Sequence, residues 1–496
     1  MENFELVSNF KPTQDQQIAI DKLYGGLNVF KNQTLNGITG SGKTFVLGKV
    51  INKTNTPTII VAPNKVLAFQ LYNEFVDMFP DEFVGYYVSN YDVYKPTYFN
   101  ESLNAKIEGK VVVNVKNKIL RYQVKDFLET SNKAILICSS TILFPTFRDD
   151  IPESVLKNKS YIIRRLNEEK AKQVSNFKKE NKVDEAIRLE DHINHSIDNL
   201  ISSVDEEDVY FNTSILSILS EKLKDFYLTD YFRNIKPNLF IDESHLSLLQ
   251  FLALPSANKK RLEKLVSKGY YINNVIKDNI LNLKQLQKNI NTTTYVSATP
   301  SKHELNNSDQ IVELLTRPNN LVDPEITLKN ENYFGSNKMV DDIIDTTLKD
   351  ETVFINCLSR KQLFVISNLL NTHNIDHEVL HFKVKQDKRK TILNDLRNGN
   401  LKVIIGINML REGIDVKQCS LVIVEQASRN NFLRTKSCLI QIAGRASRNK
   451  NGRVFMCCDT ISSSLTDAIS EINYRRNIQL SKLNLENQNK FRIFTL

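Results

Sequence analysis

The octapeptide GITGSGKT, residues 37–44, constrains the fold more than any other segment of this chain. It fits the pattern G-x-x-x-x-G-K-[ST] and lies within QTLNGITGSGKTFVLGKVI, which reads as short strand, glycine loop and helix. A loop in that context binds the phosphates of a nucleoside triphosphate. A chance glycine turn is the alternative, and the matching context argues against it. The sequence therefore predicts a nucleotide-binding α/β domain built on a parallel sheet.

A second motif, NLFIDESHLSL, completes the predicted nucleotide site. Its apolar run ends in Asp242, which can bind magnesium through water, and Glu243, which can orient and deprotonate the attacking water. Alone, an Asp-Glu pair after an apolar run is usually just the start of a loop. With the glycine loop it predicts ATP and Mg²⁺ as cofactors, with Thr44 and Asp242 as metal ligands. The expected nucleotide-site residues are Gly37, Thr39, Gly40, Ser41, Gly42, Lys43, Thr44, Asp242 and Asp415.

Composition narrows the class of partner. The chain has 66 Lys and Arg against 57 Asp and Glu, a net charge of +9 that suits a polyanion. Its six cysteines form no C-x-x-C pair, which argues against a structural zinc site and fits a reducing cytosol. The N-terminus has no signal-peptide pattern, and no apolar run reaches the ~18 residues of a membrane span. We therefore expect a cytoplasmic protein without membrane contact.

A second series of strand and helix patterns begins near residue 350 and ends in CLIQIAGRASRN. Arg445 and Arg448 are three residues apart and share a helix face. Facing the nucleotide of the first domain, they would act as arginine fingers in catalysis. Such a pair is more often simply solvated, but the order of the motifs favours a two-lobed motor. In that motor, nucleotide sits between the lobes, and hydrolysis opens and closes them.

The order GSGKT, APNK, DESH, SATP, GINMLREGID and QIAGRASR resembles superfamily 2 helicases. FKPTQDQQIAI, APNKVLAFQLYNEF and YRRNIQ make the resemblance specific to the UvrB family. It covers residues 4 to about 130 and 233 to about 480. The resemblance implies that Gln16 reads adenine beside the phosphate loop. It also implies DNA as substrate, UvrA-like and UvrC-like partners, and damage verification in nucleotide excision repair.

The stretch YVSNYDVYKPTYF corresponds in that family to a tyrosine-rich β-hairpin behind which one DNA strand threads. Aromatic faces stack on bases whatever the sequence, each contact contributing about 1–3 kcal/mol. Asn90 and Val93 stand here where the family has tyrosine. The alternative is an aromatic strand that packs the core. The expected DNA-binding residues are Tyr87, Tyr91, Tyr94, Tyr98 and Phe99.

The charged segment 151–232 matches the family worst and predicts a helical hairpin with its turn near Asn181. Its KVDEAIRLEDHI resembles the UVR motif, which in UvrB lies at the C-terminus and contacts UvrC. Because the chain ends soon after YRRNIQLSKLN, we expect no C-terminal UVR module. Our hypothesis is that a UVR-like hairpin in the insertion docks a partner. The alternative is an ordinary charged helical hairpin.

The predicted fold is α/β: two RecA-like P-loop helicase lobes, with a β-hairpin and a helical insertion in the first. The predicted segments are 1–86 and 233–325 for lobe 1, 87–150 for the hairpin and the rest of the DNA-contacting region, 151–232 for the insertion, 326–480 for lobe 2 and 481–496 for a tail. No cluster of acids or histidines with metal-ligand spacing lies outside the ATP site, so incision would belong to a partner nuclease.

Two other functions stay open at the level of sequence. One is a superfamily 2 DNA translocase in another system, such as defence or plasmid maintenance. The other is a scaffold without turnover, against which the presence of Lys43, Glu243 and the arginine pair argues.

Overall fold

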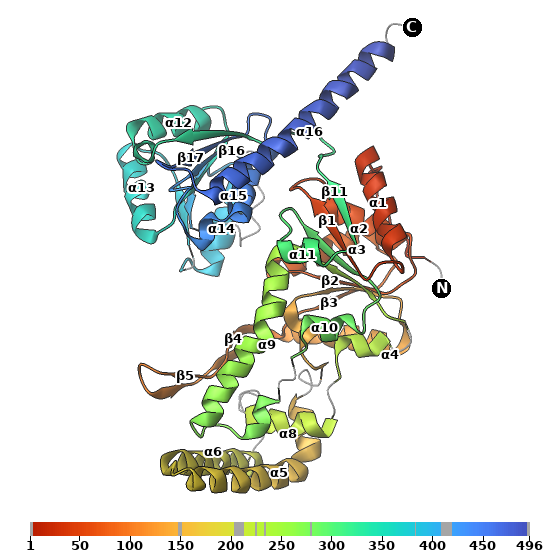
Figure 1. Ribbon diagram of the computed structural model, residues 1–496, viewed down its shortest axis with the longest axis vertical. Helices are drawn as coiled ribbons and strands as arrows, with labels where there is room; N and C mark the ends of the chain where they lie inside the picture. The colour runs from red at the N-terminus through yellow and green to blue at the C-terminus, as the bar shows by residue number, and fades with distance from the viewer. Residues whose placement is uncertain are drawn as a thin grey trace.

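The computed structural model describes residues 3–493 except 147–150, 203–212, 224–225, 233–234, 278–279, 382 and 408–418. Figure 1 shows two α/β lobes, a helical region below the first lobe, and a β-hairpin that projects from the first lobe beside that region. One long C-terminal helix passes from the second lobe along the first. The predicted fold class is confirmed.

Lobe 1 is built on a seven-stranded parallel sheet of order β11-β1-β10-β9-β2-β8-β3. Its strands are β1 (Asn32–Gly37), β2 (Thr58–Val61), β3 (Val84–Tyr87), β8 (Ile135–Cys138), β9 (Asn238–Ile241), β10 (Thr293–Ser297) and β11 (Gln310–Leu314). Every residue of β2, β8, β9 and β10 is buried, as expected when helices cover both faces of a parallel sheet. These helices include α1 (Gln14–Gly26), α2 (Lys43–Asn52), α3 (Lys65–Met78) and α4 (Val115–Thr130).

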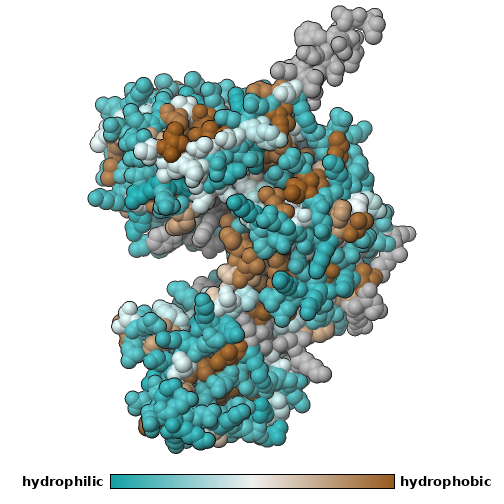
Figure 2. Space-filling model, viewed as in Figure 1, coloured by the Kyte–Doolittle hydropathy of each residue, from teal (hydrophilic) through white to brown (hydrophobic). Residues whose placement is uncertain are grey.

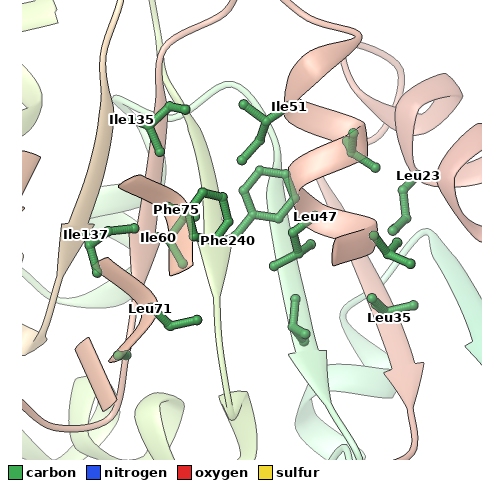
Figure 3. Close-up of a cluster of buried hydrophobic side chains, with 14 of the residues drawn as sticks. Leu23, Leu35, Leu47, Ile51, Ile60, Leu71, Phe75, Ile135, Ile137 and Phe240 are labelled. Atoms are coloured by element: carbon green, nitrogen blue, oxygen red, sulfur yellow. The ribbon is translucent and has the colours of Figure 1, made fainter. Parts of the chain in front are cut away.

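The core of lobe 1 forms where α2 and α3 pack on the middle of the sheet. Phe240 of β9 lies between Leu47 and Ile51 of α2 on one side and Phe75 of α3 on the other (Figure 3). Its side chain is fully buried. The short apolar runs of the sequence thus become central strands because each of their faces meets a helix.

The β-hairpin spans residues 91–113 in two ladders. β4 (Tyr91–Lys95) pairs antiparallel with β7 (Lys110–Val113), and β5 (Tyr98–Asn100) pairs with β6 (Ala105–Ile107). Pro96, which has no N–H to donate, separates β4 from β5. Within the predicted region 87–150, α4 and β8 belong to lobe 1, since β8 pairs with both β2 and β3.

The insertion forms the predicted helical hairpin, with α5 (Ile151–Lys179) and α6 (Val183–Ser202) joined at Asn181, whose φ is 57°. The apolar face of α6 is buried in one cluster with α8 (Thr213–Leu223) and the end of α9 (Ser244–Ser267). Gly269, after α9, lies so close to the Glu185 carbonyl that a Cβ would collide with it. Ala186, Leu189 and Ile193, which carry the UVR likeness, are fully buried within this chain.

Lobe 2 is a six-stranded parallel sheet of order β12-β17-β16-β13-β15-β14. Its strands are β12 (Glu325–Lys329), β13 (Thr352–Asn356), β14 (Glu378–Leu380), β15 (Val403–Gly406), β16 (Cys419–Val424) and β17 (Arg453–Cys457). Its helices are α12 (Asn337–Thr347), α13 (Arg360–Thr372), α14 (Gln386–Asn398), α15 (Lys436–Ala443) and α16 (Ser463–Ile493). The segment 481–493, predicted as a tail, continues α16. The short helices α10 (Leu283–Gln287) and α11 (Lys302–Asn306) flank β10 in lobe 1.

Among the described residues, no helix combines the length and apolar character that a membrane span requires.

The central position of Phe240 makes lobe 1 sensitive to its loss. We expect Phe240→Ala to lower the free energy of unfolding of lobe 1 by about 3–5 kcal/mol, because it leaves a cavity between the sheet and α2. Urea unfolding followed by circular dichroism measures the change. Phe10→Ala is the control, since Phe10 is 77% exposed and its loss should change stability by no more than ~0.5 kcal/mol. Equal effects of the two substitutions would contradict this packing.

Candidate functional site

The phosphate loop joins β1 to α2 at the edge of lobe 1 that faces lobe 2. Gly40 and Gly42 have φ angles of 79° and 82°, a left-handed conformation that glycine adopts without strain. The Ile38 carbonyl accepts hydrogen bonds from the Ser41 hydroxyl (2.8 Å) and the Ser41 N–H (3.2 Å). It also lies 3.4 Å from Lys43 Nζ. The Ser41 N–H therefore closes the loop in this structure.

Gln16 holds the phosphate loop from α1. Its Nε2 donates to the Ser41 carbonyl (2.8 Å), and its Oε1 accepts from the N–H of Thr13, the residue that caps α1 (3.0 Å). The side chain is only 3% exposed. These contacts make Gln16 a positioning residue of the loop, and the adenine contact implied by the family resemblance stays a prediction.

The acidic pair lies where β9 ends and α9 begins. Glu243 adopts a φ of 41°, so the chain turns sharply between the strand and the helix. Burial raises the pKa of Asp242 well above its usual range, the adjacent Glu243 charge adds to the rise, and Lys43 opposes it. The carboxylates of Asp242 and Glu243 are adjacent, and Lys43 offsets only part of their negative charge. A divalent cation would supply the missing positive charge, and Asp242 and the Thr44 hydroxyl could hold it.

His245 joins the acidic motif to lobe 2. Its Nδ1 lies 2.9 Å from Ser297 Oγ and 3.5 Å from Glu243 Oε2, and its Nε2 contacts the Gln441 side-chain amide. Gln441 Nε2 also donates to Thr299 Oγ1 (3.2 Å). Burial lowers the pKa of His245, so the ring is neutral near pH 7. A neutral ring with its proton on Nδ1 lets Nε2 accept from Gln441, which satisfies this network.

The two arginines lie on the 3-10 turn η8 (Gly444–Arg448), which follows α15. A Cβ on Gly40 would lie 4.0 Å from Arg448 Nε, and a Cβ on Gly444 would lie 3.5 Å from Thr39 Oγ1. This turn of lobe 2 therefore packs against the phosphate loop, with Arg448 beside it. Arg445 lies near the buried Cys419 thiol, where β16 begins. Burial raises the pKa of this thiol, and the Arg445 charge opposes the rise. Asp415 lies outside the described residues, so its place in the site stays a prediction.

A cavity of about 630 Å³ lies between the β-hairpin, the strand ends of lobe 1 and the helices α8 and α9. Tyr91, Tyr94 and Pro96 line it from the hairpin. Its cationic lining residues are Lys65, Arg121, Arg261 and Lys277. No Asp or Glu occurs among the described residues that line it. Figure 2 shows a deep notch between lobe 2 and the lower part of the molecule.

The five predicted stacking residues fall into three groups. The prediction for Tyr87 is wrong, because its ring is fully buried in β3 and its hydroxyl accepts from Arg121 Nη2 (2.7 Å). Tyr91 and Phe99 are half-buried and pack against the helical cluster, Phe99 beside Tyr270. Tyr94 and Tyr98 are 55% and 45% exposed, so their faces can meet a base.

Sequence reasoning missed three residues of the site. His245 received no role from the sequence, although it is the residue that follows Asp-Glu-Ser in the acidic motif. Arg317 and Gln479 also received no role from the sequence, although Gln479 ends the quoted YRRNIQ motif, and each is at most 4% exposed. Neither residue is marked by its neighbours, because its partners lie in other parts of the chain, and a single sequence does not show which distant residues meet.

Two family models match the chain. Residues 13–141 match the family described as DEAD/DEAH box helicase, and residues 335–450 match the family described as Helicase conserved C-terminal domain. Among solved structures, RecG bound to a three-way DNA junction has a TM-score of 0.49 at 12% identity, covering 94% of this chain and 47% of that one.

Curated relatives match almost the whole chain. UvrABC system protein B of Caldanaerobacter subterraneus is 30% identical, over 97% of this chain and 87% of the relative. The protein of the same name from Listeria innocua is also 30% identical, with the same coverage. That of Staphylococcus epidermidis is 29% identical over 96% of this chain. The chain therefore belongs to the UvrB family of superfamily 2 helicase-type ATPases.

Proposed function

We propose that this protein is an ATP-driven DNA-binding motor that verifies damage in nucleotide excision repair. One DNA strand passes through the cavity behind the β-hairpin, and ATP turnover between the lobes tests how readily the strands separate. Incision would be left to a partner nuclease.

The cavity behind the hairpin carries this proposal. Tyr94 offers an exposed face for stacking. Lys65, Arg121, Arg261 and Lys277 line the cavity, and Lys277 is paired with Glu221 (2.7 Å), so the lining carries a net positive charge that suits a phosphate backbone. The Nδ2 of Asn90, which stands where the family has tyrosine, is buried and has no hydrogen-bond partner within the described structure. An acceptor oxygen on a nucleotide would satisfy it.

ATP hydrolysis at the nucleotide site would drive the movement of the lobes. Mg²⁺ held by Thr44 and Asp242 would neutralise phosphate charge when bound. Glu243 would orient the attacking water and accept its proton, and Arg448 would stabilise the charge that develops on the transferred phosphate. His245 and Gln441 connect the acidic motif to lobe 2, so a change at the phosphates reaches the other lobe.

The relatives' name places them in a UvrABC system, and we propose that UvrA-like and UvrC-like proteins act with this one in the cytoplasm. A partner that docks on the helical insertion would have to use its polar outer face, because the apolar face of α6 is buried.

Lys43→Ala tests the motor. The substitution removes the ammonium that would meet the β and γ phosphates, so we expect ATP turnover to fall at least about 100-fold while DNA binding persists. A phosphate-release assay at saturating ATP measures turnover. Lys49→Ala, on the same helix, is the matched control and should retain wild-type turnover. Normal hydrolysis by the Lys43 variant would contradict the site assignment.

Tyr94→Ala tests the DNA path. Loss of one stacking ring should weaken binding of a labelled single strand by about 1–3 kcal/mol, or roughly 5- to 150-fold. Fluorescence anisotropy at fixed salt measures the affinity. Tyr474→Ala is the control, because Tyr474 is 54% exposed on α16, away from the hairpin. Equal affinity of the two variants would place the strand elsewhere.

The repair function itself is tested by comparing DNA substrates. We expect duplex with a bulky lesion to stimulate ATP turnover several-fold more than the same duplex without it, because weakened stacking lets the hairpin separate the strands. Equal stimulation by both duplexes would favour a translocase of another system, and no turnover with either would indicate a scaffold.

A further inference from the structure

The segment between the lobes, residues 315–324, is tied to the phosphate loop by Arg317. This guanidinium is 4% exposed. Its Nε donates to the Thr39 carbonyl of the loop (2.8 Å), its Nη1 donates to the Leu321 carbonyl (3.0 Å), and its Nη2 pairs with Asp323. One side chain of the linker thus fixes a backbone carbonyl of the nucleotide site.

The same segment is tied to lobe 2 by α16. Gln479 Oε1 accepts from the Asp323 N–H (2.6 Å), and Gln479 Nε2 donates to the Leu315 carbonyl (2.9 Å) and to Asp323 Oδ2 (3.3 Å). Arg476 donates to the Asp323 carbonyl. One amide of α16 therefore holds the linker on both sides of Arg317.

We propose that Gln479, Asp323 and Arg317 form a relay that couples movement of lobe 2 to the conformation of the phosphate loop. Arg317 acts as a positioning residue, because its described contacts are to the loop backbone and the linker. When lobe 2 moves, α16 carries Asp323 with it, and Arg317 tightens or releases the Thr39 carbonyl.

Burial makes this relay effective. Hydrogen bonds to a charged group are strong when water is excluded. The donors of a guanidinium form a rigid planar fork, so a displacement of Asp323 would reorient the donor that binds the Thr39 carbonyl. Gln479 is 3% exposed and Asp323 is 6% exposed, so water does not readily replace a broken contact. Arg475, one helical turn before Gln479, donates to the Ala298 carbonyl (2.9 Å), which gives α16 a point of contact on lobe 1 about which it can turn beside the relay.

The test measures nucleotide affinity without DNA. Titration with a fluorescent N-methylanthraniloyl ATP analogue gives Kd for wild type, Arg317→Lys, Gln479→Met and the double variant. We expect each single variant to bind about tenfold more weakly, the effect of one charge-assisted hydrogen bond. The double variant should bind no more weakly than either single variant, because both changes break the same chain of contacts.

Asn477→Met is the matched control, since Asn477 is exposed on the same helix and should bind the analogue as wild type does. Thermal unfolding verifies that each variant is folded, and Asp323→Asn, which keeps the shape of the side chain, replaces Arg317→Lys if that variant does not fold. Wild-type affinity in Gln479→Met would overturn the relay. So would a double variant about 100-fold weaker, the product expected of independent sites.

This relay deepens the proposed function, because it assumes a motor driven by lobe movement, but its measurement needs no DNA. A wild-type protein without DNA-stimulated turnover would count against the repair motor alone. Unchanged affinity in the folded variants would count against the relay alone.

Discussion

The nucleotide site depends on backbone carbonyls of the phosphate loop that are held from outside the loop. A glycine-rich loop has little conformational preference of its own, so partners must fix it. Gln16 of α1 binds the Ser41 carbonyl, and Arg317 of the linker binds the Thr39 carbonyl. Lobe 2 adds η8, whose Gly444 packs against Thr39. The conformation of the loop therefore depends on three elements that are far apart in sequence, and a shift of any one of them would change it.

The lobes meet at two places that differ in kind. In the cleft, Gln441 of lobe 2 contacts His245 and Thr299 of lobe 1. These contacts join neutral groups and can break and form again at small cost. At the linker, Arg475, Arg476 and Gln479 of α16 are bound to lobe 1 carbonyls or to the linker itself, largely out of reach of water. Such buried contacts favour a hinge at which α16 and the linker turn together, so that rotation of lobe 2 reaches Asp323 and Arg317 while the cleft opens. Movement of the lobes would then be concentrated at the side where the nucleotide binds.

The sequence predicted what depends on local pattern and failed where a contact spans the chain. The loop and the acidic strand were found because strand, turn and helix follow one another within a few residues. Tyr87 was misjudged because a tyrosine in a strand looks the same whether or not a helix covers it, and here Arg121 of α4 stacks on its ring. His245 was missed because its partner Gln441 lies 196 residues away. The α6 helix was predicted from its apolar spacing, but that spacing could not tell that the face meets α9.

The helical region supports the β-hairpin through direct contacts. Arg261 of α9 donates to the Thr97 carbonyl (2.6 Å), Lys264 pairs with Glu101 (2.8 Å), and the Phe99 ring lies beside Tyr270. On the other side, Lys65 of lobe 1 donates to the Tyr91 carbonyl at the base of the hairpin. A hairpin of two short ladders is only marginally stable alone, so these contacts fix its distance from lobe 1. Because α9 begins at the acidic motif and ends beneath the hairpin, one helix joins the nucleotide site to the wall of the cavity behind the hairpin.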